Sequence, residues 1–393
     1  MVQRLSALIV NYESGAYALA LAASLQQAWR ALGRAARELE IAVVDNASPS
    51  DQSSALGGLR ELGAQVVQAR SNLGYAAGMN LALAATRGEP DDLVLVLNPD
   101  IALFAGSLGA LLEGARESSG LGALGPRAFL DPSRTWRMPP NRLPTPESDR
   151  AQELALHDEA LAARLCAERT RHALREWTAR EPTQVEMLSG ACLLLPRSAI
   201  QKAGGLFDER YPLYYEDTDL FQRLTRAGLA LLLDPRAEIV HHWARSSGIE
   251  SQDPEPARRL AISRAAYFAR WSDTGEPATP ASSPSPAAGI ADRFQSLGAI
   301  VRPPLLEFPH GARWLVELAM LPSFPLAAGA IVEGNRWRMD ERAWEWFYRG
   351  RYFVRAVDLA DSTERAAWTF DKPSPARTAP LEPRELEAPT NVR

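Results

Sequence analysis

The sequence is poor in cysteine, has no basic excess and has no long apolar run. Its two cysteines, Cys166 and Cys192, offer neither a disulfide framework nor the spacing of a zinc site, so we expect a cytoplasmic protein. The net charge of −5 argues against a generic nucleic-acid binder, and no nucleic-acid partner is expected. The turn after the first expected strand lacks G-x-G-x-x-G, which argues against a dinucleotide-dependent oxidoreductase.

Membrane-spanning segments are also missing from the sequence. The first ten residues lead into polar ones without a cleavage-type site, so neither a signal peptide nor a membrane span is expected. The nearest candidate, Trp314 to Val332, contains Glu317, Pro322 and Pro325. This composition is typical of an interfacial segment, and we expect at most peripheral contact with the inner face of a membrane through residues 312–332.

Short apolar runs alternate with helical patterns in the first hundred residues. The run Leu93–Leu97 is too short for an ordinary helix and suits a strand buried on both faces, and Asn98-Pro99 ends it. Similar runs at 5–10, 40–44 and 65–68 are separated by helical stretches at 17–39, 54–62 and 75–85. This order predicts an α/β fold with a mainly parallel, doubly wound central sheet.

Composition divides the chain into further parts. We expect one domain over residues 1–271, interrupted by a variable insertion at 127–185 that contains a proline-rich loop and a charged helical stretch. A Pro/Ser-rich linker at 272–289 should lead to an aromatic-rich extension at 290–371, which we expect to be helical. The tail at 372–393 should be disordered.

Polar clusters follow several expected strands or open helices, where ligands bind in open α/β sheets. They are Asp45-Asn46, Arg70 to Asn80, Asn98-Pro99-Asp100, Glu216-Asp217 and His241-His242. Together they suit a site for a sugar nucleotide and a divalent metal, Mg²⁺ or Mn²⁺, with Asp100 as an oxygen ligand. Asp217 can take the proton of an acceptor hydroxyl, and neighbouring Glu216 and Asp219 should raise its proton affinity by repulsion. The alternatives are that Asp100 only caps the next segment and that residues 216–219 are an acidic helix N-terminus.

Seven segments in consistent order resemble family 2 glycosyltransferases, closest to their rhamnosyltransferase-like branch, between Leu5 and Trp271. They are Val10-Asn11-Tyr12, Val44-Asp45-Asn46-Ala47-Ser48, Asn72-Leu73-Gly74-Tyr75-Ala76-Ala77-Gly78-Met79-Asn80, Leu97-Asn98-Pro99-Asp100, Leu188-Ser189-Gly190-Ala191, Phe207-Asp208-Glu209 and Tyr215-Glu216-Asp217-Thr218-Asp219-Leu220. The resemblance implies a GT-A fold, a nucleoside-diphosphate sugar donor, a glycan or lipid-linked acceptor, and inverting transfer of a sugar such as rhamnose.

The resemblance also implies residue roles. Asp217, beside Glu216, would be the base, and Asp100 would bind the metal. The residues expected around the donor are Asn11, Tyr12, Asp45 (at the nucleobase), Asn46, Arg70, Asn72, Gly74, Asn80, Asn98 and Asp100. Gly190 and Trp243 would contact the acceptor. Asn98 replaces the first acid of the usual D-x-D motif, which weakens the expected metal affinity.

The family's His-x-x-Gly-x-Ser motif fits this sequence in two registers. It can begin at His241, with Ala244 at the glycine position, or at His242, with Arg245 there. Either histidine could complete the metal site, and the other would be structural. Two alternative functions remain. A nucleotidyltransferase would need a glycine- and lysine-rich phosphate loop, which residues 11–15 lack. The other alternative is a catalytically degenerate module that binds a nucleotide sugar, a membrane or a partner.

Overall fold

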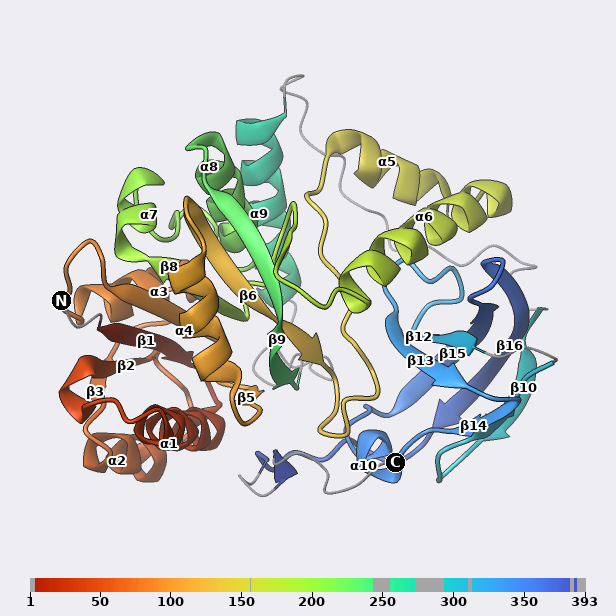
Figure 1. The fold of residues 1–393 in the computed structure, drawn as a ribbon, viewed down its shortest axis with the longest axis horizontal. Coiled ribbons are helices and arrows are strands. Elements are labelled where there is room, and N and C mark those ends of the chain that lie inside the picture. The colour runs from red at the N-terminus through yellow and green to blue at the C-terminus, as the bar shows by residue number, and fades with distance from the viewer. Residues whose placement is uncertain are drawn as a thin grey trace.

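The computed structural model describes residues 4–155, 157–242, 255–272, 293–309, 313–381 and 385–386. A large central sheet with helices on both faces occupies one side of the molecule, and a smaller β-sheet lies on the other side (Figure 1). Helices α5 and α6 lie above the smaller sheet in this view. The helices are α1 (Gly15–Ala31), α2 (Ser53–Glu61), α3 (Tyr75–Ala84), α4 (Ser107–Glu117), α5 (Pro146–Ala155), α6 (Glu159–Trp177), α7 (Arg197–Lys202), α8 (Glu216–Arg226), α9 (Glu255–Trp271) and α10 (Glu341–Trp344).

The central sheet confirms the α/β prediction and refines its topology. Its strands are β1 (Leu5–Asn11), β2 (Leu39–Asp45), β3 (Gln65–Gln68), β4 (Leu93–Leu97), β5 (Ile101–Leu103), β6 (Leu121–Phe129), β7 (Thr183–Gln184), β8 (Cys192–Pro196) and β9 (Ala230–His241). The order is β3-β2-β1-β4-β8-β6-β9-β5, with β7 also paired to β9. The first four strands are parallel as predicted, but β8 is antiparallel to both β4 and β6, so the sheet is mixed.

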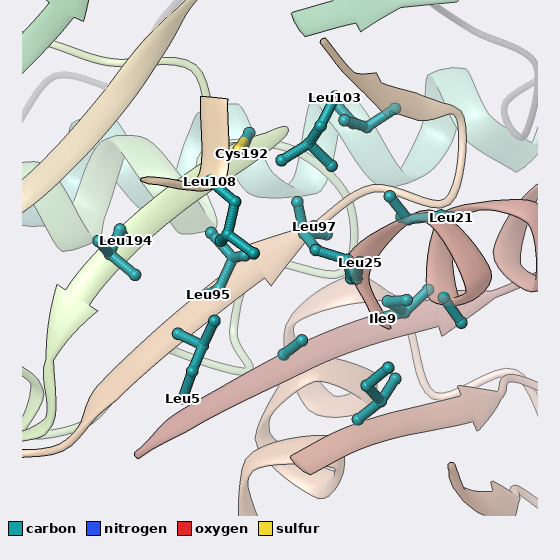
Figure 2. Close-up of a cluster of buried hydrophobic side chains, with 14 of the residues drawn as sticks. Leu5, Ile9, Leu21, Leu25, Leu95, Leu97, Leu103, Leu108, Cys192 and Leu194 are labelled. Carbon is teal, nitrogen blue, oxygen red and sulfur yellow. The ribbon is translucent and has the colours of Figure 1, made fainter. Parts of the chain in front are cut away.

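Alternate residues of the central strands pack into two separate cores, which explains their continuous apolar runs. Figure 2 shows one core, where Leu5 and Ile9 of β1 and Leu95 of β4 meet Leu21 and Leu25 of α1. The intervening side chains of the same strands pack on the other face against α3, α7 and α8. The parallel register places Asn11 beside Asp45, so the polar residues that follow the strands reach one edge of the sheet.

The expectation of a helical extension at 290–371 is wrong. This region contains β10 (Gln295–Ala299), β11 (Leu305–Glu307), β12 (Arg313–Ala319), β13 (Ala328–Glu333), β14 (Arg336–Arg338), β15 (Gly350–Asp358) and β16 (Thr363–Lys372). Five of them form a sheet in the order β10-β16-β15-β12-β13, and β11 pairs with β14. Trp314, Val316 and Leu318 point into one core while Leu315 points into another, which is the two-residue period of a strand.

The insertion and the extension pack together as one unit. The backbone of Arg137, just after β6, exchanges two hydrogen bonds with Gly329 of β13, at 2.9 and 3.0 Å. Helix α6 lies on the smaller sheet, where the fully buried Glu317 of β12 accepts hydrogen bonds from Arg169 and Arg355, both at 12% side-chain exposure or less. The extension therefore completes the core of the preceding region and is not a separate appendage.

The packing of α6 on β13 predicts that Gly329→Ala destabilises the protein by roughly 1–3 kcal/mol, the usual range for overpacking. A Cβ at Gly329 would overlap the ring of Trp177, whose Nε1 is held by the carbonyl of Met138 at 2.8 Å. Chemical denaturation followed by tryptophan fluorescence measures the effect. The control is Gly57→Ala in α2, where a Cβ meets no atom within 4 Å and stability should be unchanged or slightly raised. Equal stability of both variants would contradict this packing.

The expected disorder of 372–393 does not hold for the residues that the structure describes there. Leu381 and Leu386 are buried in a cluster with Phe104, Phe129 and Trp346. Arg377 Nη1 lies 2.6 Å from Glu385 Oε1. The linker expected at 272–289 lies, after Ser272, outside the described residues.

Within the predicted membrane-contact segment 312–332, most of the described residues, 313–332, are buried or half-buried, which leaves only part of the segment for such a contact. Trp314, Leu315 and Val316 are fully buried in β12. The exposed apolar residues of this segment lie in the loop between β12 and β13. Among the described residues, no helix combines the length and apolar character needed to cross a membrane.

Candidate functional site

A cavity of about 790 Å³ opens beyond the carboxyl ends of β1 and β4 and beside the first turn of α8. Ten predicted site residues line it: Tyr12, Asn46, Asn72, Gly74, Asn98, Asp100, Gly190, Glu216, Asp217 and His241. Five predicted residues do not: Asn11, Asp45, Arg70, Asn80 and His242. Trp243 lies outside the described residues. Acids from β4 and α8, more than a hundred residues apart in the chain, therefore reach one cavity.

Asp100 and His241 are brought together by strand pairing. The residue after Asp100, Ile101 of β5, pairs with His241 at the end of antiparallel β9. The His241 Nε2 atom lies 3.5 Å from Asp100 Oδ1, and Asp100 is almost fully buried. One carboxylate and one imidazole thus project into the same part of the cavity.

His242 has different surroundings. Its ring stacks on Trp346 with centroids 4.0 Å apart and planes 15° apart, and Tyr17 lies near it. It belongs to the packing between the central sheet and the extension, whereas His241 lines the cavity. The geometry thus distinguishes the two histidines that the motif spacing left open.

The pair of Asp100 and His241 fits a divalent cation that completes its coordination with ligand phosphates. No group of at least three His, Cys, Asp or Glu side chains suited to a metal occurs among the described residues. Mg²⁺ and Mn²⁺ commonly take only one or two protein ligands beside substrate phosphates and water, and Mn²⁺ also accepts imidazole. The His241 Nδ1 atom is buried without a hydrogen-bond partner in the described structure, and the Nε2 atom faces Asp100.

Asp217 is held in the first turn of α8 by backbone donors. Its Oδ2 accepts a hydrogen bond from the Gly190 N–H at 3.1 Å, and its Oδ1 accepts one from the Thr218 N–H at 2.7 Å. A Cβ on Gly190 would lie 2.5 Å from Asp217 Oδ2, so only glycine permits this close approach. Gly190 therefore positions the carboxylate of Asp217, while its predicted contact with the acceptor stays a prediction.

Burial raises the pKa of both acids in this turn. Burial is the main cause for Asp217, and the hydrogen bonds from Thr218 and Gly190 oppose it. For Glu216, burial and then the charge of Asp217 raise the pKa well above its usual value. The predicted repulsion from Glu216 and Asp219 is not among the largest causes of the raised pKa of Asp217. Instead, fully buried Asp219 pairs with Arg223 and Arg270 at 2.7 and 2.9 Å, which fixes α8 against α9.

Tyr75 lines the cavity, although the sequence analysis gave it no role in the site. Its hydroxyl donates a hydrogen bond to Asn98 Oδ1 at 2.8 Å. Its pKa is raised well above the usual value, first by burial and then by the charges of Glu216, Asp217 and Asp100. The hydroxyl of Tyr75 thus lies near acids from both segments, in agreement with the cavity lining.

The loop before α8 has a strained backbone. Tyr214 and Tyr215 both have a positive φ, 61° and 67°, a conformation that bulky residues rarely adopt. Gly74 packs against this loop with a φ of 86°, and a Cβ there would lie 2.7 Å from the Pro212 carbonyl oxygen. Such strain is typical of functional sites, and here it places Asp217 at the cavity and Tyr214 on its lining.

The residues expected around the donor divide into two groups. In the first group, Asn46 Nδ2 donates hydrogen bonds to Asn72 Oδ1 at 3.2 Å and to the Gly74 carbonyl at 3.1 Å, which links these residues at the edge of the cavity. Arg259 of α9, which the sequence gave no reason to single out, also donates to Asn72 Oδ1 at 3.0 Å and lines the cavity.

In the second group, the side chains lie off the cavity lining and belong to the structure around it. Asp45 Oδ1 accepts hydrogen bonds from Asn11 Nδ2 at 2.9 Å and Ser48 Oγ at 2.7 Å. Asn80 ties α3 to the backbone of Phe207 at 2.9 Å. Arg70 is exposed. Contact of these residues with a donor stays a prediction.

Comparisons with known proteins agree with the motifs. The family model described as "Glycosyl transferase family 2" matches residues 6–201. A protein of Mycobacterium tuberculosis named N-acetylglucosaminyl-diphospho-decaprenol L-rhamnosyltransferase is 33% identical over 277 residues. The match covers 66% of this chain and 81% of that relative.

Solved structures give weaker likenesses. The mannosyltransferase PcManGT of Pyrobaculum calidifontis, in complex with GDP-Man and Mn²⁺, has a TM-score of 0.41 at 15% identity, over 70% of this chain and 77% of that one. S. aureus TarS 1-349 has a TM-score of 0.40 at 15% identity, over 69% of this chain and 73% of that one. These scores are too low to carry an inference about the site.

Proposed function

Because the chain belongs to glycosyl transferase family 2 and is a glycosyltransferase with a GT-A fold, we propose that it transfers a sugar from a nucleoside diphosphate to a hydroxyl of a lipid-linked glycan. Rhamnose is the proposed sugar, since the M. tuberculosis relative is named a rhamnosyltransferase acting on a decaprenol-linked acceptor. A lipid-linked acceptor also suits a protein working at the inner face of a membrane. The observation that carries the proposal is the cavity lined together by Asp100, Asp217 and His241.

Asp217 is the proposed base of an inverting displacement. Its carboxylate takes the proton of the acceptor hydroxyl as the oxygen attacks the anomeric carbon, and the bond from that carbon to the nucleoside diphosphate breaks. The backbone N–H groups of Gly190 and Thr218 hold the carboxylate in place without occupying both oxygens fully. Burial and the charge of Asp217 raise the pKa of the neighbouring Glu216 well above its usual value.

Asp100 and His241 are the proposed ligands of a divalent cation. When bound, the cation would supply positive charge to the departing diphosphate. The residues that would orient the donor are Asn72, Asn98 and Arg259, all on the cavity lining. Tyr75 would hold Asn98 through the hydrogen bond between its hydroxyl and Asn98 Oδ1.

A transfer assay with a panel of nucleoside-diphosphate sugars tests the proposal. We expect release of nucleoside diphosphate from the rhamnose donor only when a lipid-linked acceptor is present, and a product with the opposite anomeric configuration to the donor by NMR. Retained configuration would contradict direct displacement. Donor-induced thermal stabilisation without turnover of any acceptor would instead favour a degenerate binding module.

The raised pKa of Asp217 predicts the pH dependence of turnover. The base must be ionised, and burial moves its pKa above the ordinary value of 3.8. As pH falls through this raised pKa, the carboxylate gains a proton and kcat should fall, so the acidic limb of the profile should have its midpoint above 3.8. A stopped assay of kcat against pH at saturating substrates measures this limb. A midpoint at or below 3.8 would contradict the role of a buried Asp217.

A further inference from the structure

One part of the cavity lining is apolar, and its residues come from other segments of the sequence than the acids do. It comprises Met138, Pro139 and Pro140 from the segment after β6, Trp177 at the end of α6, and Leu326 before β13. These residues come from the insertion and the extension, which pack together through Arg137 and Gly329. The cavity thus joins a polar part around Asp217 to an apolar part built by the second unit of the molecule.

The apolar lining continues onto an exposed loop. Three large apolar side chains within seven residues of the β12–β13 loop are exposed: Met320 at 43%, Leu321 at 52% and Leu326 at 55%. Leu326 belongs to both the loop and the cavity lining. Exposed apolar side chains close in the chain to a cavity-lining residue make this loop a candidate binding surface.

A cation lies in the same apolar part. Arg127 lines the cavity and donates to the backbone carbonyls of Glu176 and Ala179, so it sits at the end of α6 beside Trp177. Its Nε is buried without a hydrogen-bond partner in the described structure. The neighbouring acid on this lining, Glu176, lies 3.2 Å from His172 Nε2. An occupant of this part should therefore combine an apolar chain with negative charge.

We infer that the β12–β13 loop and the apolar lining bind the polyprenyl chain of the acceptor, with Arg127 interacting with its diphosphate. This inference rests on the proposed function, because it concerns the acceptor of that reaction. A sugar linked through a diphosphate to a polyprenyl chain matches the lining in chemistry: a hydroxyl for Asp217, negative charge for Arg127 and an apolar chain for Leu326. A protein segment or a second copy of this chain would not need the cation beside the apolar surface.

Kinetics with two matched acceptors test the inference. Both carry N-acetylglucosaminyl diphosphate, one on decaprenol and one on a butyl group. For the double variant Leu321→Ser/Leu326→Ser in the full chain, we expect KM for the decaprenyl acceptor to rise about tenfold, because two half-exposed leucines lose apolar contact. KM for the butyl acceptor should not change. The control Leu154→Ser, on α5 with 54% exposure and off the cavity lining, should alter neither value.

An unchanged ratio of the two KM values would overturn the inference, whether both values stay the same or both rise equally. If the double variant also binds acceptor-free anionic vesicles more weakly while the ratio is unchanged, the loop is a membrane contact only.

Binding of decaprenyl diphosphate in detergent micelles separates this inference from the proposed function, because it needs no turnover. If wild type transfers sugar to neither acceptor, the proposed function fails. Weaker binding of decaprenyl diphosphate to the double variant than to wild type and Leu154→Ser would still support the lipid site. Equal binding by all three proteins would overturn it.

Discussion

Asp217→Asn should lower kcat about 10³-fold, within the range expected for loss of a general base. The amide has nearly the same shape, and its one oxygen can keep one of the two backbone hydrogen bonds, from Gly190 or from Thr218, so the fold should be kept. It cannot take a proton from the acceptor hydroxyl. Release of nucleoside diphosphate at saturating donor and acceptor measures the effect, and the donor-induced rise in melting temperature shows whether binding persists.

The matched control for this variant is Asp51→Asn. Asp51 is exposed, lies off the cavity lining and accepts a hydrogen bond from the Ser53 N–H, which asparagine can also accept. Its kcat should equal that of wild type. Wild-type kcat in Asp217→Asn would remove Asp217 from the role of base, whereas a loss of donor binding together with kcat would assign it a structural role.

Gly190→Ala should lower kcat about 100-fold without changing any ionisable group. The added Cβ would lie 2.5 Å from Asp217 Oδ2 and 2.8 Å from its Cβ, so the first turn of α8 must move away from β8. A displacement of about 1 Å in a catalytic group can cost this much in rate. The assay is the same as for Asp217→Asn, and circular dichroism checks that the fold is retained.

A double variant sharpens the prediction for Gly190. If the alanine acts by displacing the base, adding it to Asp217→Asn should cause little further loss of kcat, because the two changes affect one interaction. Gly57→Ala, where the Cβ meets no atom within 4 Å, should leave kcat unchanged. Full additivity in the double variant would show that Gly190 acts by another route, such as contact with the acceptor.

The central sheet could be predicted because its local signals agree with its packing. The run Leu93–Leu97 is short, apolar and ended by proline, and the structure buries every residue of it in β4. The antiparallel pairing of β8 was not predicted, for a physical reason. The run Cys192–Pro196 is equally apolar whether it pairs parallel or antiparallel, and its direction is set by the long insertion that precedes it.

The strands of the extension were not predicted from the sequence because both faces of their sheet are covered. In β15, Val354 packs into one core, and Phe353 and Val357 pack into two others, so polar residues do not alternate with apolar ones as in a half-exposed strand. Aromatic residues such as Tyr352 of β15 and Phe370 of β16 are cross-strand neighbours in this sheet, with ring centroids 5.5 Å apart. That α6 covers one face could not be read from either segment alone.

Motif spacing located most of the cavity but not its finer geometry. The choice between His241 and His242 depends on the pairing of β5 with β9, which sequence spacing does not reveal. Arg259 and Leu326 reach the cavity from α9 and the β12–β13 loop, beyond the segments that carry the resemblance. Asp45, predicted at the nucleobase, lies off the cavity lining and accepts hydrogen bonds from Asn11 and Ser48, so its contact with a donor stays a prediction.

A crystal structure with the donor's nucleoside diphosphate and Mn²⁺ is the most direct test of how the cavity works. We predict the ion bound by Asp100 and His241 and bridging the two phosphates, with Asp217 facing the position of the anomeric carbon. A nucleotide bound outside this cavity, or one whose phosphates leave both Asp100 and His241 without contact, would contradict the account.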